Sequence, residues 1–355
     1  MKEEFPVIQI EDIAFGGKGV GRLAGKVVFV PFTAPGDTIA VELVRQKKSF
    51  AEGRMRKLLV PSPHRTEPLC PYFTRCGGCA YQHLQYDAQL SAKEKQVEQT
   101  LRRVGKLSDV PMKRMIPSVN TYGYRNRIRV HRAEGVTGFF GYESRGLVDI
   151  EQCVISKPEV NRALHRLRGS KVEDGDYSLR ASGGAGPFFE QVNEAVTIAL
   201  VELLDGTLRR DQELLVDAYS GGGRFARALA THARHVVGIE SSAAAVDYAR
   251  KHAGPSERYF AGDVSDLLGE VLAQHDALRT SVILDPPAEG LMARALDLLL
   301  GNAPSEIAYV SCNPATLARD LAALVKSYKL MAVTPLDMFP QTAGIEVCAH
   351  LLRAS

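Results

Sequence analysis

The sequence predicts a protein of mixed β and α/β class. It has a small N-terminal β-barrel, a β-rich middle part with a cysteine cluster, and a C-terminal doubly wound α/β domain. Short apolar runs separated by glycine turns fill the first 60 residues, which is typical of a small barrel. From about residue 190, strand-like and helix-like segments alternate, which indicates a mostly parallel sheet covered by helices. We therefore expect three domains, at residues 1–60, 61–188 and 189–355.

The barrel is predicted from three apolar runs. VIQI begins at Val7, KVVFV at Lys26 and TIAVELV at Thr38, and the turn sequence APGD separates the last two runs. The Pro-Ser-Pro sequence at residues 61–63 is a plausible end of this domain because proline interrupts strands.

The middle and C-terminal parts are predicted from pattern changes along the chain. A cysteine-rich stretch precedes a predicted helix over residues 87–105, and strand-like runs then return between residues 122 and 155. Further helices are expected at 158–168, 193–204, 224–232, 242–252, 290–300 and 314–326, and strands at 214–219, 235–240, 281–284 and 306–311, before a closing pair.

Basic residues gather in one region of the chain. Between residues 93 and 134 there are eleven lysines and arginines and only four acidic residues. From about residue 190 onward, acidic residues outnumber basic ones. A basic region on an otherwise acidic chain suits a polyanionic partner such as nucleic acid.

Several protein classes are excluded by the composition. The N-terminus MKEEFPVIQI lacks the basic and apolar segments of a signal peptide, and no run of about eighteen apolar residues could span a membrane. Six cysteines in 355 residues do not resemble a secreted disulfide framework. We expect a cytoplasmic protein.

A glycine-rich loop predicts a cofactor site. The run DAYSGGGRF from Asp217 follows a strand and opens a helix, so its glycines permit a tight turn and close approach of a ligand. Glu240 ends the next strand, where a carboxylate can accept hydrogen bonds from ribose hydroxyls, and Asp263 is expected near an adenine ring. The loop alone is compatible with both a nicotinamide and an S-adenosylmethionine cofactor.

Two neighbouring strands end in reactive side chains. One runs into Asp285 and two prolines, the next ends at Cys312 in the run YVSCNPAT, and Glu346 lies at a later strand. Methylation at C5 of uracil needs a thiolate that adds to C6 and a separate base that removes the C5 proton. Cys312 and Glu346 match these two roles.

At this point the C-terminal half resembles the RNA (uracil-5-)-methyltransferase family, whose domain is Rossmann-like. The matching runs are FFEQVN from Phe188, DAYSGGG from Asp217, DPP from Asp285, SCNPAT from Ser311 and PQTAGIE from Pro340. The resemblance implies that Cys312 is the nucleophile and that Glu346 is the base.

The resemblance also implies an S-adenosylmethionine site. The residues expected to line it are Gln191, Tyr219, Arg224, Glu240, Asp263 and Asp285, the last of these between cofactor and target base. The chain departs from the family pattern at Ser220, Arg224 and Ala288, where the family usually has cysteine, a small polar residue and arginine. These departures affect the fine cofactor and RNA contacts but neither the nucleophile nor the base.

Four cysteines form a second candidate site: Cys70, Cys76 and Cys79 in the run CPYFTRCGGC, and Cys153 far downstream. Four thiolates suit either an iron–sulfur cluster or tetrahedral zinc, and their spacing does not separate these. The fourth cysteine argues against a radical S-adenosylmethionine enzyme, and no strand leads into a helix as in a redox dithiol. The arrangement resembles the cluster-bearing branch of the same family, which implies a [4Fe-4S] cluster.

Residues 1–60 resemble a TRAM domain, an OB-like barrel that binds RNA, on the runs IAFGGKGVGRL, VFVPF and PGD. Candidate RNA contacts in this barrel are Lys18, Arg22, Lys26, Lys48, Phe15 and Phe50. In the run YRNRIRVH, alternation places Arg125, Arg127 and Arg129 on one strand face, where they would line an RNA channel.

The sequence thus predicts a monomeric, S-adenosylmethionine-dependent RNA uridine-C5 methyltransferase, with 23S ribosomal RNA favoured over transfer RNA as substrate. Two other readings are a nicotinamide oxidoreductase with an iron–sulfur cluster and a non-catalytic RNA-binding protein on a methyltransferase fold. The first does not explain the SCNP and DPP runs. The second is raised by the departures at Arg224 and Ala288.

Overall fold

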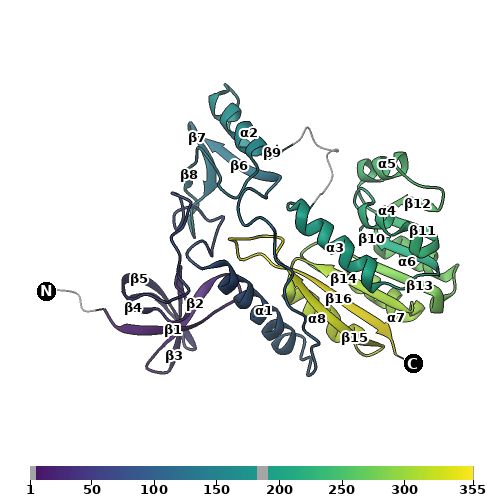
Figure 1. Ribbon diagram of the computed structural model, residues 1–355, viewed down its shortest axis with the longest axis horizontal. Coiled ribbons are helices and arrows are strands. Elements are labelled where there is room, and N and C mark those ends of the chain that lie inside the picture. Colours follow the sequence, from purple (N-terminus) through teal and green to yellow (C-terminus); the bar gives the residue numbers. More distant parts are fainter. Residues whose placement is uncertain (1–4, 182–190, 355) are drawn as a thin grey trace. The chain divides into compact units, whose positions relative to one another are not determined.

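The computed structural model describes residues 5–181 and 191–354 (Figure 1). Contacts between Cα atoms divide the chain into two compact units. Unit 1 comprises residues 1–96, 120–182 and 339–344, and unit 2 comprises residues 97–119, 183–338 and 345–355. Among the described residues, no helix has both the length and the apolar character needed to cross a membrane.

Unit 1 begins with a closed five-stranded barrel. Its strands are β1 (Val7–Ile13), β2 (Lys18–Leu23), β3 (Lys26–Pro31), β4 (Thr38–Gln46) and β5 (Phe50–Val60), in the order β1-β2-β3-β5-β4. Alternate residues such as Ile8, Ile10, Val28 and Val30 point inward and form the barrel core. Closure pairs every strand on both sides and leaves no open edge.

A saturated carboxylate joins the barrel to the segment that follows it. Asp37 is fully buried, and its oxygens accept hydrogen bonds from Ala34 N (2.6 Å), Ser62 N (2.9 Å) and two guanidinium nitrogens of Arg65 (2.8 and 2.7 Å). Burial by itself raises the pKa of Asp37, but the hydrogen bonds from Arg65, Ala34 and Ser62 outweigh it and hold that pKa below its usual range. The ion pair therefore fixes the barrel turn against residues 62–65.

The rest of unit 1 contains a four-stranded sheet and one packed helix. The strands are β6 (Arg127–Ala133), β7 (Val136–Phe140), β8 (Leu147–Asp149) and β9 (Gly175–Arg180), in the order β8-β7-β6-β9. Helix α2 (Pro158–Gly169) packs Val160 and Leu164 against Ile128 and Val130 of β6. Because residues alternate along a strand, Arg127, Arg129 and His131 lie on the opposite face of β6.

Helix α1 (Tyr86–Arg103) crosses from unit 1 into unit 2 at Gln96. Unit 2 is built on a seven-stranded sheet in the order β12-β11-β10-β13-β14-β16-β15. The strands are β10 (Gln212–Ala218), β11 (Ala233–Glu240), β12 (Glu257–Ala261), β13 (Thr280–Leu284), β14 (Glu306–Ser311), β15 (Tyr328–Leu336) and β16 (Glu346–Arg353). Strands β10 to β14 run parallel, and β16 is inserted antiparallel between β14 and β15.

The strands of unit 2 are connected by helices. These are α3 (Glu194–Thr207), α4 (Arg224–Ala228), α5 (Ala243–Lys251), α6 (Val264–Ala273), α7 (Ala293–Asn302) and α8 (Pro314–Leu324), with short 3₁₀ turns at Ala230–His232 and Ala277–Arg279. Side chains on the central strands are almost fully buried, which explains why these strands read as continuous apolar runs. The predicted combination of barrel, β-rich middle part and α/β domain is confirmed.

Some predicted elements differ from the observed ones. Strands β2 and β5 of the barrel were not predicted, because glycines and charged residues interrupt their apolar alternation. Strand β9 was missed for the same reason, since GDYSLR has few apolar residues. The helix expected at 224–232 ends at Ala228, where a short 3₁₀ turn replaces its second half.

The Asp37–Arg65 pair yields a stability prediction. Asp37→Ala should lower the free energy of unfolding of unit 1 by about 2–4 kcal/mol, because it leaves the partly buried Arg65 guanidinium and two backbone N–H groups without their acceptor. Urea unfolding followed by circular dichroism measures this loss. Glu98→Ala removes the exposed Glu98–Arg102 pair and should cost less than about 1 kcal/mol. Equal losses in both variants would contradict the role assigned to Asp37.

Candidate active site and cysteine pocket

The register of β14 and β16 brings Cys312 and Glu346 together. Ser311, the last residue of β14, lies opposite Val347, the second residue of β16. In an antiparallel pair the next residues, Cys312 and Glu346, are then neighbours across the strands. Cys312 is exposed, whereas Glu346 is 1% exposed. The sheet therefore sets a thiol that is open to solvent beside a buried carboxyl group.

Asp285 is the third member of this group. It follows β13, the strand beside β14, and its backbone N donates to Ala218 O at the end of β10 (3.3 Å). Gln191 Nε2 lies 3.4 Å from an oxygen of its carboxyl group. Burial raises the pKa of Asp285 to about 7, although the Gln191 contact opposes the rise. Asp285 and Glu346 are thus two desolvated carboxyl groups that share one strand edge.

The electrostatics of the site raise the pKa values of its reactive groups. Burial raises the pKa of Glu346 well above its ordinary value, and the charge of Asp285 adds to the rise. Burial, Glu346 and Asp285 together raise the pKa of the Cys312 thiol to about 11. A carboxylate with a raised pKa is a stronger base once ionised, which suits the removal of a weakly acidic proton.

The loop after Asp285 is tied to the start of α8. Asn313 Nδ2 and Thr316 Oγ1 both donate to Ala288 O at 3.0 Å. The buried Asp320 carboxylate accepts from Leu291 N (2.9 Å) and from Tyr309 Oη (2.6 Å). At Ala288, where the family usually has arginine, the loop is therefore held through its backbone. This anchoring keeps Asp285 in place beside Cys312.

A pocket of about 360 Å³ lies at the loop after β10. Four residues predicted to bind cofactor line it, namely Gln191, Tyr219, Arg224 and Asp285. Gly223 has φ +76°, and a Cβ atom there would lie 2.6 Å from the Tyr259 hydroxyl, so only glycine fits. Glycine at this position thus lets the loop pack closely against Tyr259. The motif residues at 188–190 fall outside the described residues.

Glu240 and Asp263 lie next to this pocket and do not line it. The Glu240 carboxylate accepts from Gly221 N (3.0 Å) and Ser242 N (2.7 Å), so it supports the glycine loop. Asp263 accepts from Ser265 N (2.7 Å) and caps α6. Burial raises the pKa of Tyr219 to about 12, with Asp263 contributing. The contacts of Glu240 and Asp263 with a cofactor stay predictions.

Asp217 is a site residue whose role the sequence did not reveal. It is fully buried at the end of β10, and one of its oxygens accepts from Ala226 N (2.8 Å). Its other oxygen has no hydrogen-bond partner among the described residues. Burial raises the pKa of Asp217 to about 7, with Asp285 and Glu240 contributing. The available signal in the sequence was an aspartate near the end of an otherwise apolar strand.

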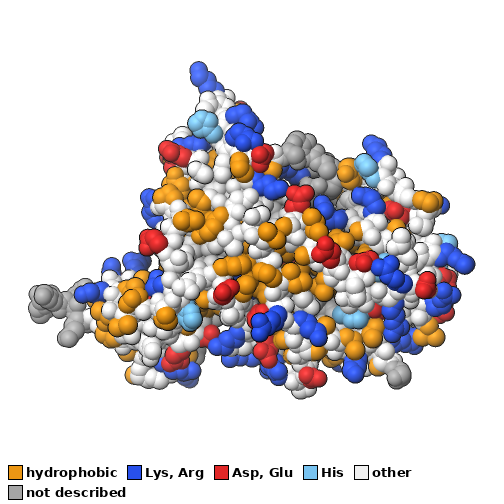
Figure 2. Space-filling view, in the orientation of Figure 1, with side chains coloured by type: hydrophobic (Ala, Val, Ile, Leu, Met, Phe, Trp, Pro, Cys, Tyr) orange, Lys and Arg blue, Asp and Glu red, His pale blue; other side chains and the backbone are white. Residues whose placement is uncertain are grey.

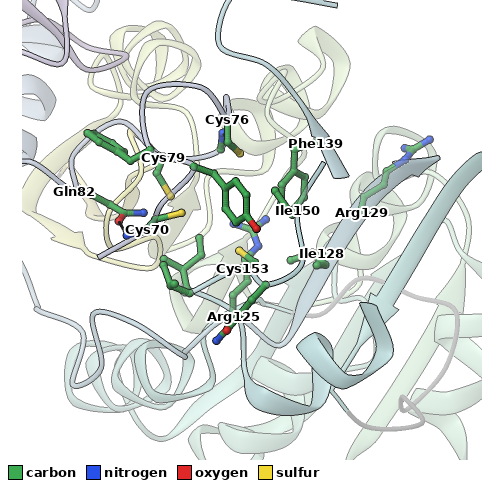
Figure 3. Close-up of a pocket in the computed structure, with 16 residues that line it drawn as sticks. Cys70, Cys76, Cys79, Gln82, Arg125, Ile128, Arg129, Phe139, Ile150 and Cys153 are labelled. Carbon is green, nitrogen blue, oxygen red and sulfur yellow. Dashed lines mark hydrogen bonds between the residues drawn. The ribbon is translucent and has the colours of Figure 1, made fainter. Parts of the chain in front are cut away.

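The four predicted cysteine ligands line one cavity of about 280 Å³ in unit 1, with their sulfur atoms directed into it (Figure 3). All six cysteines of the chain are described, and each is free of disulfide bonds. Asn161 Oδ1 accepts from Cys153 N (2.9 Å), and Gln82 Oε1 accepts from Cys70 N (3.1 Å). In the described ranges, no three His, Cys, Asp or Glu side chains are spaced as ligands of one metal ion.

The thiols of this cavity, which we call the cysteine pocket, are desolvated. Burial raises the pKa of Cys79 to about 12, and the thiols of Cys153, Cys76 and Cys70 add to the rise. Burial also raises the pKa values of Cys76 and Cys153. Ionised thiolates would therefore repel one another here unless a positively charged group offset them.

Two family models match the chain. The model for tRNA (Uracil-5-)-methyltransferase matches residues 267–354, which include Asp285, Cys312 and Glu346. The TRAM domain model matches residues 6–55, which form most of the five-stranded barrel.

Whole-chain relatives agree with both models. An uncharacterized RNA methyltransferase of Bdellovibrio bacteriovorus is 33% identical over 376 residues, covering 97% of this chain and 94% of the relative. One of Thermosynechococcus vestitus is 31% identical over 439 residues, covering 97% of each. The structure of Pyrococcus abyssi tRNA (uracil-54, C5)-methyltransferase with S-adenosyl-L-homocysteine has a TM-score of 0.71 at 25% identity, covering 97% of this chain and 100% of that chain.

The buried Asp217 predicts a pH-dependent stability. Its folded-state pKa of about 7 lies above the value in the unfolded chain, so its stabilising contribution is complete only below about pH 4 and is lost as the pH rises through 7. In Asp217→Asn, the decrease in the free energy of unfolding as the pH rises should be smaller by up to about 4 kcal/mol. Urea unfolding between pH 4 and 8 measures it. An unchanged pH dependence in the variant would disprove the assignment.

Proposed function

The chain belongs to the TRAM-containing RNA methyltransferases of the uracil-5 type, and we propose that it transfers a methyl group from S-adenosylmethionine to C5 of a uridine in structured RNA. The observation that carries this proposal is the β14–β16 register, which sets the thiol of Cys312 beside the carboxyl group of Glu346. A nucleophile and a separate base are the two groups that this reaction requires.

The proposed mechanism begins when the Cys312 sulfur, as the thiolate, adds to C6 of the uracil ring. The electron pair of the C5–C6 double bond moves toward O4, so that C5 becomes nucleophilic. C5 would then bond to the methyl group that S-adenosylmethionine supplies when bound in the pocket; the methyl–sulfur bond breaks, its electron pair stays on the resulting thioether, and the C4 carbonyl re-forms. Glu346 takes the proton from C5, the C5–C6 double bond re-forms, and the bond between sulfur and C6 breaks.

Protein groups around the ring would support these steps. Asp285 lines the cofactor pocket, and its charge raises the pKa of Glu346. Gln191 contacts Asp285 and lines the same pocket, so it would connect the cofactor with the carboxyl group beside the target uracil. The target uridine must leave its stack to reach Cys312, and an RNA loop makes this least costly.

RNA contacts are proposed in both parts of unit 1. The barrel carries Lys18, Arg22 and Lys26 on its strands, beside the aromatic pair Phe29 and Phe50. The face of β6 with Arg127, Arg129 and His131 also bears Phe140 of β7, whose ring lies 4.2 Å from His131. Basic side chains also gather over α2 (Figure 2). Cationic and aromatic groups together suit single-stranded RNA.

We propose 23S ribosomal RNA as the substrate and transfer RNA as the alternative. The combination of a barrel with a cysteine pocket favours the first, whereas the solved relative from Pyrococcus abyssi is a tRNA (uracil-54, C5)-methyltransferase. Mapping of 5-methyluridine by mass spectrometry in RNA from cells with and without this protein distinguishes the two.

We also propose a division into three domains, with boundaries after residues 60 and 188. The second boundary falls outside the described residues.

The cysteine pocket is proposed to hold a [4Fe-4S] cluster through Cys70, Cys76, Cys79 and Cys153. The cavity of about 280 Å³ that these four cysteines line has room for more than a single metal ion. Four thiols around such a volume suit a multi-atom group better than a single zinc ion, whose ligands lie ~2.3 Å from it. Its cationic iron would offset the raised pKa values of these thiols.

Cys312→Ala tests the nucleophile. This variant should form no 5-methyluridine and no covalent adduct with 5-fluorouridine RNA, because it lacks the attacking sulfur, whereas its affinity for RNA should stay within about twofold. Methyl transfer assays and denaturing gels measure these properties. Residual turnover in Cys312→Ala would reject the mechanism and favour a non-catalytic or differently catalysed function.

Iron and sulfide analysis tests the cluster. Anaerobically purified protein should contain about four irons and four sulfides per chain, and Cys70→Ala should lose most of both. Cys348→Ala, which changes a buried cysteine of β16 outside the pocket, should keep them. Zinc at one equivalent in place of iron would overturn the cluster assignment while leaving the methyltransferase assignment intact.

A further inference from the structure

The segment just before Glu346 belongs to unit 1 although its neighbours in sequence belong to unit 2. The chain leaves unit 2 after Met338, contributes residues 339–344 to unit 1, and returns at Ile345. We call residues 339–344 the base loop because Glu346 follows it at once. Several hydrogen bonds within unit 1 hold this loop.

Gln341 is the centre of the base loop. Its carbonyl oxygen accepts from Ala80 N and Tyr81 N, both at 3.0 Å. Its backbone N donates to Gln89 Oε1 (3.1 Å), and Gln89 Nε2 donates back to Gln341 Oε1 (3.0 Å). Gln341 has φ +69°, a left-handed conformation that is costly for a residue with a Cβ atom. The four hydrogen bonds over-determine this strained position.

Two further side chains hold the residues before Gln341. Lys93, fully buried on α1, donates from Nζ to Phe339 O (3.1 Å). Tyr124, 3% exposed, donates from Oη to Pro340 O (3.0 Å). Both hydrogen bonds hold the backbone of the base loop, one from α1 and one from the segment before β6.

The loop between Gln341 and Glu346 is itself stiff. Thr342 Oγ1 donates to Phe339 O (2.9 Å), and Gly344 N donates to Thr342 Oγ1 (3.1 Å). A Cβ atom at Gly344 would lie 2.9 Å from the Phe339 ring, which requires glycine there. A displacement of Gln341 is therefore passed along the chain toward Glu346 and is not absorbed by a flexible linker.

We infer that Gln341 is a positioning residue for Glu346, through which the cysteine-bearing segment controls removal of the C5 proton. Ala80 and Tyr81 directly follow Cys79, so the backbone that carries a ligand of the cysteine pocket also grips the base loop. This inference rests on the proposed function. It gives the cysteine pocket a role in a reaction that transfers no electrons: it keeps the catalytic base in place.

The inference predicts a defect in a single step. With Gln341 released, Cys312 still adds to C6 and C5 still receives the methyl group, since neither step uses Glu346. The C5 proton then remains, so the C5–C6 double bond does not re-form and the sulfur stays bound to C6. The methylated RNA should therefore accumulate as a covalent complex with the protein.

Gln89→Met tests this, because it removes both side-chain hydrogen bonds to Gln341 at similar volume. With uridine RNA and methyl-labelled cofactor, release of free methylated RNA should slow by at least about tenfold while labelled covalent complex accumulates. With 5-fluorouridine RNA, where the base has no proton to remove, the adduct should form within about twofold of the wild-type rate. Single-turnover sampling on denaturing gels measures both.

Ser91→Ala is the control on the same helix. Ser91 Oγ donates to Asp87 O within α1 (2.9 Å), so this variant removes a hydrogen bond that does not involve the base loop. This variant should accumulate no covalent complex. Glu346→Gln is the positive control and should accumulate it. If Gln89→Met does not fold, Gln341→Gly, which tolerates the positive φ, removes one of the two hydrogen bonds, the one between the two side-chain amides.

The outcomes separate the two claims. If the wild type forms no adduct with 5-fluorouridine RNA, the proposed function is wrong. If the wild type forms it, but Gln89→Met slows adduct formation and product release equally, Gln89 has only a structural role and the inference is overturned. Release at the wild-type rate without accumulated complex overturns it as well.

Discussion

The active site depends on one antiparallel strand pair within an otherwise parallel sheet. Strand β16 enters between β14 and β15, so its first residue meets the residue that follows β14. A parallel β16 would carry its first residue to the other end of the sheet, away from Cys312. A slip of one residue would turn Glu346 to the opposite face. The register of the buried sheet thus brings the two reactive groups to the same edge.

Much of this site could be predicted because its members lie at strand ends in distinctive runs. Cys312, Asp285 and Glu346 each follow or begin an apolar strand, and such ends meet at one edge of the sheet. The support of the base could not be predicted. Gln89 and Gln341 are 252 residues apart, and no local pattern announces a contact between two side-chain amides. Long-range polar contacts of this kind depend on the finished fold.

In the barrel, too, some strands could be predicted from a local sequence pattern and others only from the complete fold. Its apolar strands β1, β3 and β4 were predicted from alternation, whereas β2 and β5 required closure of the sheet to be recognised. Gly19 and Gly21 weaken the sequence pattern of β2. Both positions require glycine, because a Cβ atom there would collide with Thr33 or with the backbone of Gln9. Close approach of neighbouring strands selects glycine, and glycine removes the sequence signal.

The raised pKa of Asp285 has a consequence for the order of events in the proposed reaction. A sulfonium cofactor carries a positive charge, which favours ionisation of a carboxyl group that burial keeps near pKa 7. Once the methyl group has left, the remaining thioether is neutral and no longer supports that ionisation. The proton affinity of the paired carboxyl groups then rises, at the moment when the ring must lose its proton. Departure of the methyl group would in this way prime the site to complete the turnover.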